Sequence, residues 1–369
     1  MVHSDETKQL KEVIELMSVK TFVNQQPFKL ECGKVLPGLH LAYTALGKLN
    51  EAGDNVVWVF HALTANSDPS EWWYGLVGEG KIFDPAVYYI VCVNMPGSCY
   101  GSISPLDVDQ QTNDPYFHRF PWFTTRDMVR SYQLLRKHLG INKIFVGLGG
   151  SMGGQQLLEW AVEEPGLFKN IVPIATNARH SPWGVAFNAS QRWCIEADPT
   201  WKNDGETAGL DGMKIARSIA LISYRNYHTY DHAQQSVTSD TTDLTIDEQV
   251  FRAESYQHYQ GHKLALRFNA FSYYFLSKGM DAHDLARGRI SLEDSLNTIQ
   301  AKTLVIGIET DLLFPIREQQ FLAAHIPDAQ FILIDSQYGH DGFLLEFEKI
   351  TEHLQRFLCL EGVKMIVHR

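Results

Sequence analysis

Ser151 is the residue of this sequence best placed to do chemistry, because it lies in the glycine-rich run Gly149-Gly-Ser-Met-Gly153. This G-x-S-x-G pattern is typical of a nucleophile elbow, in which a strand ends, the chain turns sharply and a helix begins at once. An apolar run before Ser151 and helical spacing after it supply both elements. Such a turn lifts the hydroxyl clear of the sheet at the positive end of the helix, where a tetrahedral oxyanion is stabilised. We therefore predict a nucleophilic Ser151, against the alternative of a plain glycine-rich turn.

A serine hydroxyl at neutral pH needs a base within hydrogen-bond reach, and the base needs an acid that orients it. In folds with this elbow the acid follows a later strand and the histidine follows the last one. Asp311 comes after the last but one apolar run of the chain, and His340 comes after the last one. We therefore predict Asp311 as the acid and His340 as the base. Glu309 is the competing acid, ranked second because it lies only one residue beyond the strand run.

The oxyanion of an acyl-transfer intermediate needs two backbone N–H donors. One comes from the residue after the nucleophile, which is Met152, and one from the loop after an early strand. That loop reads His61-Ala-Leu-Thr64, and we choose Leu63 as the second donor. The alternative is that this loop is an ordinary turn.

Two other patterns are weaker candidates for chemistry. Cys99 lies in a G-x-C-x-G run, but the Ser-Ile-Ser-Pro that ends at Pro105 cannot begin a helix there, so no helix dipole would activate the thiol. His228 and His232 have i, i+4 spacing, but they lack the adjacent glutamate of a metalloprotease and an evident third ligand. We expect no metal site.

The elements that must position these residues form an α/β pattern. Helical segments fall between several of the short apolar runs, the clearest over residues 125–139. Near-continuous apolar runs are expected of strands covered on both faces, and hence of a parallel sheet with helices on both sides. Six runs have this character: 56–60, 88–93, 144–146, 171–175, 304–308 and 331–334.

The start of the chain reads differently. Residues 1–24 are expected to be loosely packed. The alternating segments 28–31 and 39–43, which flank Gly33 and a Pro-Gly pair, predict an antiparallel hairpin at the sheet edge.

The strand rhythm disappears between residues 176 and 298, which are rich in helical patterning and aromatic residues. Helices are expected near 213–224, 255–260 and 264–276, with a surface loop in the acidic, threonine-rich stretch from Thr238. A long helical insertion between two core strands is best explained as a cap over the end of the sheet. The predicted domains are therefore a core of residues 1–175 and 299–369 and a helical cap of residues 176–298.

Composition limits the kinds of partner. The 369 residues carry a formal charge of −11, which argues against broad binding to nucleic acid or anionic membranes. No apolar run approaches the roughly 20 residues of a membrane span, and the N-terminus has no signal-peptide pattern. Five widely spaced cysteines without a C-x-x-C motif suit a reducing compartment.

From about Phe28 to Phe357 the sequence resembles the homoserine O-acetyltransferase family of α/β-hydrolase-fold acyltransferases. The resemblance implies acetyl transfer from the co-substrate acetyl-CoA to the hydroxyl of L-homoserine, an early step toward methionine. It also implies a cytoplasmic homodimer without a further cofactor. The stretches that carry it are Phe60-His-Ala-Leu-Thr, Gly97-Ser-Cys-Tyr-Gly-Ser-Ile-Ser-Pro, Phe120-Pro-Trp-Phe-Thr-Thr-Arg-Asp-Met-Val, the elbow, Asn177-Ala-Arg-His-Ser-Pro-Trp, Arg217-Ser-Ile-Ala-Leu-Ile-Ser-Tyr, Glu254-Ser-Tyr and Tyr338-Gly-His-Asp-Gly-Phe.

The resemblance also implies a clamp for the amino acid, made by Arg217 and Asp341 with Tyr224 nearby. Homoserine is a zwitterion, so a guanidinium can hold its carboxylate and a carboxylate can hold its ammonium group. Asp341 is adjacent to His340, which would anchor the ammonium beside the base, and Arg217 would come from the cap.

The expected mechanism is ping-pong through an acyl-Ser151 intermediate, with the cap keeping water from that intermediate. Ala65, Ser98 and Ile103 depart from the family pattern and leave the acyl group and the acceptor open. Succinyl transfer, serine as acceptor, and a plain esterase or thioesterase are the alternatives. A catalytically silent binding module is a further one.

Overall fold

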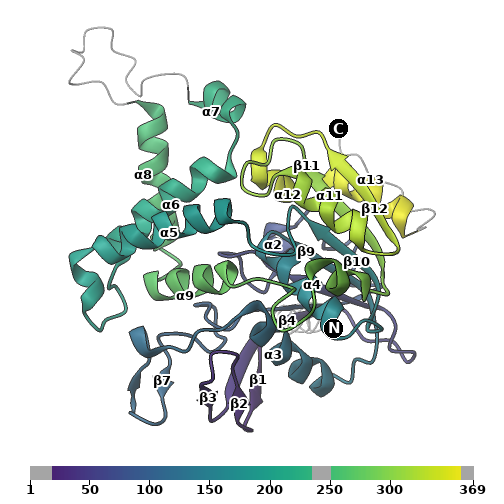
Figure 1. Ribbon diagram of the computed structural model, residues 1–369, viewed down its shortest axis with the longest axis horizontal. Helices are drawn as coiled ribbons and strands as arrows, with labels where there is room; N and C mark the ends of the chain where they lie inside the picture. Colours follow the sequence, from purple (N-terminus) through teal and green to yellow (C-terminus); the bar gives the residue numbers. More distant parts are fainter. Residues whose placement is uncertain (1–18, 235–250, 359–369) are drawn as a thin grey trace, which may run out of the picture.

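The computed structural model describes residues 19–234 and 251–358 and is built around one eight-stranded sheet (Figure 1). The strand order is β1-β4-β6-β5-β9-β10-β11-β12. Neighbours from β6 to β12 pair in parallel, whereas β4 pairs antiparallel with both β1 and β6. The bounds are β1 (Lys20–Asn24), β4 (Leu39–Leu46), β5 (Val56–Phe60), β6 (Tyr89–Val93), β9 (Ile144–Gly150), β10 (Phe168–Ile174), β11 (Lys302–Ile308) and β12 (Ala329–Ile334). The predicted α/β class and its mostly parallel sheet are confirmed.

The central strand β5 explains why the strand runs are almost continuously apolar. Its five residues are all buried. Trp58 and Phe60 belong to the hydrophobic cluster on one face of the sheet, and Val57 and Val59 to the cluster on the other. Because successive side chains of a strand point to opposite faces, a sheet covered on both faces needs apolar residues at every position.

Helices cover both faces of the sheet. The helix predicted over 125–139 is present as α3, which begins with a capping box between Thr124 and Asp127. Gly140 follows the end of α3 with φ of 69°. Among the described residues, the α-helices outside 176–298 are α2 (Pro69–Trp72), α3 (Thr125–His138), α4 (Met152–Glu163), α11 (Ile316–His325), α12 (Gly342–Leu345) and α13 (Phe347–Phe357).

The prediction for the start of the chain was wrong in two respects. Residues 20–24 are not loosely packed, because β1 pairs along its whole length with β4. The expected hairpin does not form either: β2 (Phe28–Lys29) pairs with β3 (Val35–Leu36) around Gly33, whose φ is 86°. The chain thus turns back before it reaches β4, which leaves β4 free to join the main sheet. Residues 1–18 and the expected loop from Thr238 to residue 247 lie outside the described residues.

The interval between β10 and β11 is helical in the part of the chain that the structure describes, and its helices gather on one side of the strands (Figure 1). The helix expected over 264–276 is interrupted, because α8 ends at Ala265 and Asn269 caps a new helix by accepting a hydrogen bond from the Ser272 amide. That residues 176–298 form a separate domain stays a prediction. The helices are α5 (Pro182–Ala197), α6 (Leu210–Tyr224), α7 (Tyr227–Ala233), α8 (Arg252–Ala265), α9 (Ala270–Asp281) and α10 (Leu292–Asn297).

No helix in residues 19–234 and 251–358 is long and apolar enough to cross a membrane.

Candidate active site

Ser151 sits at a turn that only its glycine neighbours allow. It connects β9 to α4 with φ of 56° and ψ of −127°, a conformation that costs a non-glycine residue about 1–3 kcal/mol. A Cβ on Gly149 would lie 2.5 Å from the Gly153 carbonyl oxygen, and one on Gly153 would lie 2.1 Å from that of Phe60. The glycines therefore let α4 leave directly from the sheet, and the strained Ser151 is held by its N–H donating to Ile174 at 3.0 Å.

His340 and Asp311 form a buried pair at the neighbouring strand ends. The His340 Nδ1 atom lies 2.7 Å from Asp311 Oδ2, and the two residues are 3% and 6% exposed. The other carboxylate oxygen of Asp311 accepts hydrogen bonds from the amides of Leu313 and Phe314, each at 2.8 Å. An ionised carboxylate only accepts, so Nδ1 carries the proton and Nε2 is left as the basic nitrogen.

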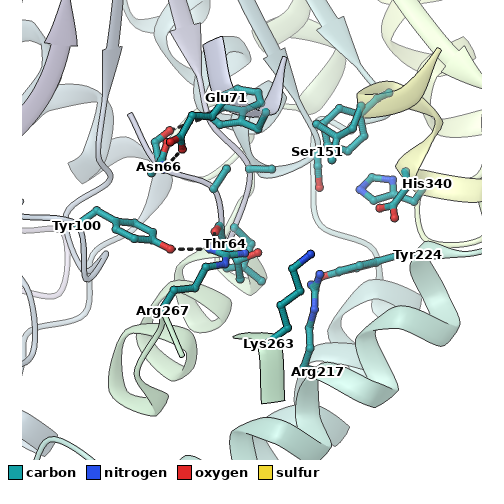
Figure 2. Close-up of a pocket in the computed structure, with 17 residues that line it drawn as sticks. Thr64, Asn66, Glu71, Tyr100, Ser151, Arg217, Tyr224, Lys263, Arg267 and His340 are labelled. Carbon is teal, nitrogen blue, oxygen red and sulfur yellow. Dashed lines mark hydrogen bonds between the residues drawn. The ribbon is translucent and has the colours of Figure 1, made fainter. Parts of the chain in front are cut away.

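Ser151 and His340 line one pocket of about 570 Å³. Figure 2 shows the serine hydroxyl and the imidazole beside each other at one end of this pocket. Phe314 stacks on the imidazole with 5.1 Å between ring centroids, which restricts how the ring can turn. The hydrogen bonds of the described residues do not include one from Ser151 Oγ to His340, so the proton-transfer contact itself stays a prediction.

Glu309 is exposed, and among the described residues it makes no hydrogen bond to His340. The geometry therefore favours Asp311 as the acid.

Of the two amides chosen for the oxyanion hole, one adjoins Ser151 in the chain and the other belongs to the pocket that contains Ser151. Met152 is the first residue of α4, and Leu63 lies in the loop after β5 and lines the pocket. In the described turns and loops, neither amide donates to a backbone carbonyl. Both N–H groups are therefore available to an oxyanion.

His61, which the sequence analysis did not single out, holds the loop that carries Leu63. Its Nε2 accepts a hydrogen bond from the Met95 amide at 3.0 Å, and its Nδ1 lies 2.9 Å from the Ala62 carbonyl oxygen. Burial lowers the pKa of His61 to about 4, so the ring is neutral at physiological pH. Only the position of His61 directly after a buried strand could have indicated this role.

The three residues implied for substrate binding line the same pocket as Ser151 and His340. The Arg217 guanidinium lies over the Tyr224 ring, 5.4 Å from its centroid, and the Tyr224 ring lies 5.8 Å from that of His340. Asp341 Oδ2 lies 2.8 Å from Arg225 Nη1. The middle of α6, through Arg217, and the turn that carries His340, through Asp341, thus contribute opposite charges to one cavity.

Two further cations line the pocket, and the sequence analysis missed them. Lys263 lies in the last turn of α8 and Arg267 lies just beyond the end of that helix, and their i, i+4 spacing was the available signal. Arg267 Nη1 donates to the Thr64 carbonyl oxygen at 2.6 Å and to the Tyr100 hydroxyl at 2.5 Å. Figure 2 shows this bridge across the pocket and the ends of Lys263 and Arg217 on the side of Ser151.

The weaker candidates do not gain from the structure. Burial raises the pKa of the Cys99 thiol to about 11, so it is protonated at neutral pH. His228 and His232 lie on α7. Within the described residues, no group of three or more His, Cys, Asp or Glu side chains could hold a metal ion.

Comparisons with known proteins agree with this geometry. Residues 55–347 match the alpha/beta hydrolase fold family. A homoserine O-acetyltransferase of Cyclobacterium marinum is 45% identical over 92% of this chain and 95% of its own. A crystal structure of homoserine O-acetyltransferase from Bacillus anthracis superposes with a TM-score of 0.84 at 24% identity, covering 94% of this chain and 98% of that one. The crystal structure of esterase E22 gives a TM-score of 0.82 at 22% identity, with 92% and 100% covered. At these identities the two structures support the fold alone.

Proposed function

Because the chain belongs to the homoserine O-acetyltransferase family within the α/β-hydrolase fold, we propose that it transfers acetyl from acetyl-CoA to the hydroxyl of L-homoserine. One observation carries this proposal: a single pocket contains Ser151, His340, a guanidinium and a carboxylate. The first two suit acyl transfer through an enzyme ester. The last two suit the carboxylate and ammonium groups of an amino-acid acceptor, which a simple esterase does not need.

The first half-reaction acylates the enzyme. His340 Nε2 takes the Ser151 proton while Oγ attacks the thioester carbon, and the Met152 and Leu63 amides stabilise the oxyanion. When the intermediate collapses, the C–S bond breaks, the protonated His340 gives its proton to the departing thiolate, and CoA leaves. Asp311 stabilises the imidazolium through the 2.7 Å hydrogen bond at Nδ1.

The second half-reaction uses the acceptor where a hydrolase uses water. Arg217 holds the homoserine carboxylate and Asp341 its ammonium group, so the hydroxyl lies near His340 Nε2. His340 takes the hydroxyl proton, the oxygen attacks the acyl-serine, and Ser151 recovers its proton as O-acetyl-L-homoserine forms. The helical cap over the pocket limits access of water to the ester.

Lys263 and Arg267 are suited to binding the acyl donor, acetyl-CoA. Neither residue forms an ion pair among the described residues, although both line the pocket of a chain with net charge −11. Arg217 is sufficient for the single carboxylate of the acceptor, whereas CoA carries several phosphate charges. We therefore assign Lys263 and Arg267 to the phosphate groups of CoA, which cations attract and hold.

The resemblance further supports a homodimer that acts in the cytoplasm on the route to methionine. Light scattering of the purified chain tests the dimer, and a monomer at micromolar concentration would contradict it.

Initial-rate kinetics test the proposed reaction. With acetyl-CoA and homoserine varied together, a ping-pong enzyme gives parallel reciprocal lines, and mass spectrometry of enzyme quenched without homoserine gives acetyl on Ser151. Ser151→Ala should lose CoA release by about 10⁴-fold or more, since the residue acts as a unit with its base. Intersecting lines, or an active Ser151→Ala protein, would contradict the mechanism.

An esterase or thioesterase is the second candidate, favoured by the likeness in fold to esterase E22. It predicts that homoserine does not accelerate CoA release and that Arg217→Ala leaves acyl-CoA turnover unchanged. Crossing acyl-CoAs of different chain length with homoserine and serine, with products identified by mass spectrometry, also decides between acetyl and succinyl transfer and between the two acceptors.

A further inference from the structure

The two charged residues of the proposed clamp share a cavity without neutralising each other. Arg217 and Asp341 both line the pocket, yet no ion pair joins them in the part of the chain that the structure describes. Opposite charges in a partly desolvated pocket attract strongly, and a direct pair would occupy both groups that a zwitterion needs. Something must therefore keep them apart.

Asp341 forms its ion pair with Arg225 instead of with Arg217. Its Nη1 atom lies 2.8 Å from Asp341 Oδ2, and the two side chains are only 24% and 16% exposed. The Nη2 atom of Arg225 donates to the Tyr256 hydroxyl at 3.3 Å, while its Nε is buried without a hydrogen-bond partner. The position of the Arg225 side chain is therefore set by its contacts with Asp341 and Tyr256, although its Nε–H group has no hydrogen-bond acceptor among the described residues.

The backbone fixes the point from which Arg225 reaches Asp341. Arg225 caps the C-terminus of α6, and its N–H donates to the Leu221 carbonyl oxygen at 3.0 Å. Gly339 in the His340 turn has φ of 64°, and a Cβ there would lie 2.8 Å from both the Tyr224 carbonyl oxygen and the Arg225 carbonyl carbon. The end of α6 and the turn that carries His340 and Asp341 thus pack backbone against backbone.

We propose that Arg225 is a positioning residue for the acceptor site, which holds Asp341 Oδ2 so that Oδ1 can receive the ammonium group of the substrate. The inference rests on the proposed function. A carboxylate has acceptor sites on both oxygens, so one oxygen can pair with Arg225 while the other binds substrate. Without Arg225, the Asp341 carboxylate loses the contact that fixes its position, and the ammonium arm of the clamp is lost.

Kinetics of Arg225→Met and Arg225→Lys test the proposal. Arg225→Met, which keeps most of the stem without the charge, should raise the homoserine KM about tenfold or more, because a charge-assisted contact to substrate is lost. Acylation of Ser151 by acetyl-CoA should stay within about twofold, since that step does not use the acceptor clamp. Arg225→Lys restores the positive charge and should recover most of the homoserine KM.

An acceptor without the amino group separates positioning from general damage. The KM for 4-hydroxybutyrate, which has no ammonium to bind Asp341, should be the same in wild type and Arg225→Met. Arg192→Met is the matched control, because it breaks another cap ion pair, with Asp281 at 2.6 Å, that does not line the pocket. It should leave the homoserine KM unchanged.

An unchanged homoserine KM in folded Arg225→Met would contradict the inference, as would an equal rise for 4-hydroxybutyrate or an equal loss of acylation. If Arg225→Met does not fold, Arg225→Gln is measured by the same criteria. Wild type without homoserine-dependent transfer would contradict the proposed function itself. Normal wild-type transfer with a normal Arg225→Met would contradict only the role of Arg225.

Discussion

The predicted core and the predicted cap, residues 176–298, contribute to the pocket in physically different ways. On the core side, His340 and Asp311 are 3% and 6% exposed and Ser151 is held by its backbone, so each reacting group has one position. On the cap side, Lys263 and Arg267 are exposed cations without acidic partners among the described residues. Bond-making groups lose rate when misplaced by about 1 Å, whereas charges attract a substrate over several ångströms. Catalysis here therefore depends on rigid placement of the reacting groups, whereas substrate recognition depends mainly on electrostatic attraction.

A buried ion-pair cluster connects the two regions outside the pocket lining. Glu159 of α4 is fully buried and accepts hydrogen bonds from Arg126 of the core at 2.7 Å and from Arg289 of the cap at 2.6 Å. Although burial alone would raise it, the hydrogen bonds and charges of Arg289 and Arg126 lower the pKa of Glu159. The helix α4, which follows Ser151, is therefore anchored to Arg289 by a carboxylate whose ionised form the two arginines favour.

The largest effect is expected on the core side. Asp311→Asn would offer Nδ1 of His340 an amide donor, so the proton moves to Nε2 and the base cannot accept from Ser151. We expect kcat to fall about 10³- to 10⁴-fold, with homoserine binding unchanged by calorimetry. Glu309→Gln is the matched control and should stay within about twofold of wild type. A comparable loss in Glu309→Gln would show that the acid has been misassigned.

A smaller effect is expected on the cap side. Lys263→Gln should raise the acetyl-CoA KM about tenfold, because one charge-assisted phosphate contact is lost, and the effect should shrink as salt is added. Acetyl-pantetheine carries no phosphate, so its KM should not change.

Lys169→Gln is the control, because it removes a cation that lies over Phe145. It should leave the KM for acetyl-CoA and the KM for acetyl-pantetheine unchanged. A rise in KM for homoserine instead of acetyl-CoA would assign Lys263 to the acceptor and remove the proposed phosphate site.

The smallest effect is expected on the free energy of unfolding, to which buried histidines of both regions contribute. Burial lowers the pKa of His61 in the core and of His283 in the cap interval to about 4. Their unfolded pKa is near 6.5, so the folded state binds fewer protons, and stability present above pH 6.5 is lost as the pH falls toward 4. Each histidine should cost about 2 kcal/mol at pH 5 relative to pH 7.

Urea unfolding at both pH values measures the loss, and His283→Gln should reduce its pH dependence. Equal stability at pH 5 and pH 7 would contradict the buried neutral state of these histidines.

The sequence identified the groups whose placement depends on local backbone. Ser151, Asp311 and His340 each follow a short apolar run, and strand ends of a parallel sheet meet at one edge, so their order along the chain was enough to propose a triad. The elbow could be predicted because only glycine tolerates the close approaches around Ser151. The edge strand β1 was missed because its mostly exposed residues have no clear apolar pattern.

Only the tertiary structure decided which side chains meet across the pocket. Arg225 and Asp341 are 116 residues apart, and nothing in either local sequence specifies the other, yet packing of α6 on the His340 turn brings them to 2.8 Å. Lys263 of α8 and Arg267, which follows that helix, line the cavity only because of how this segment packs. Local backbone structure can be predicted from neighbouring residues, whereas contacts between distant side chains depend on how the helices and strands pack together.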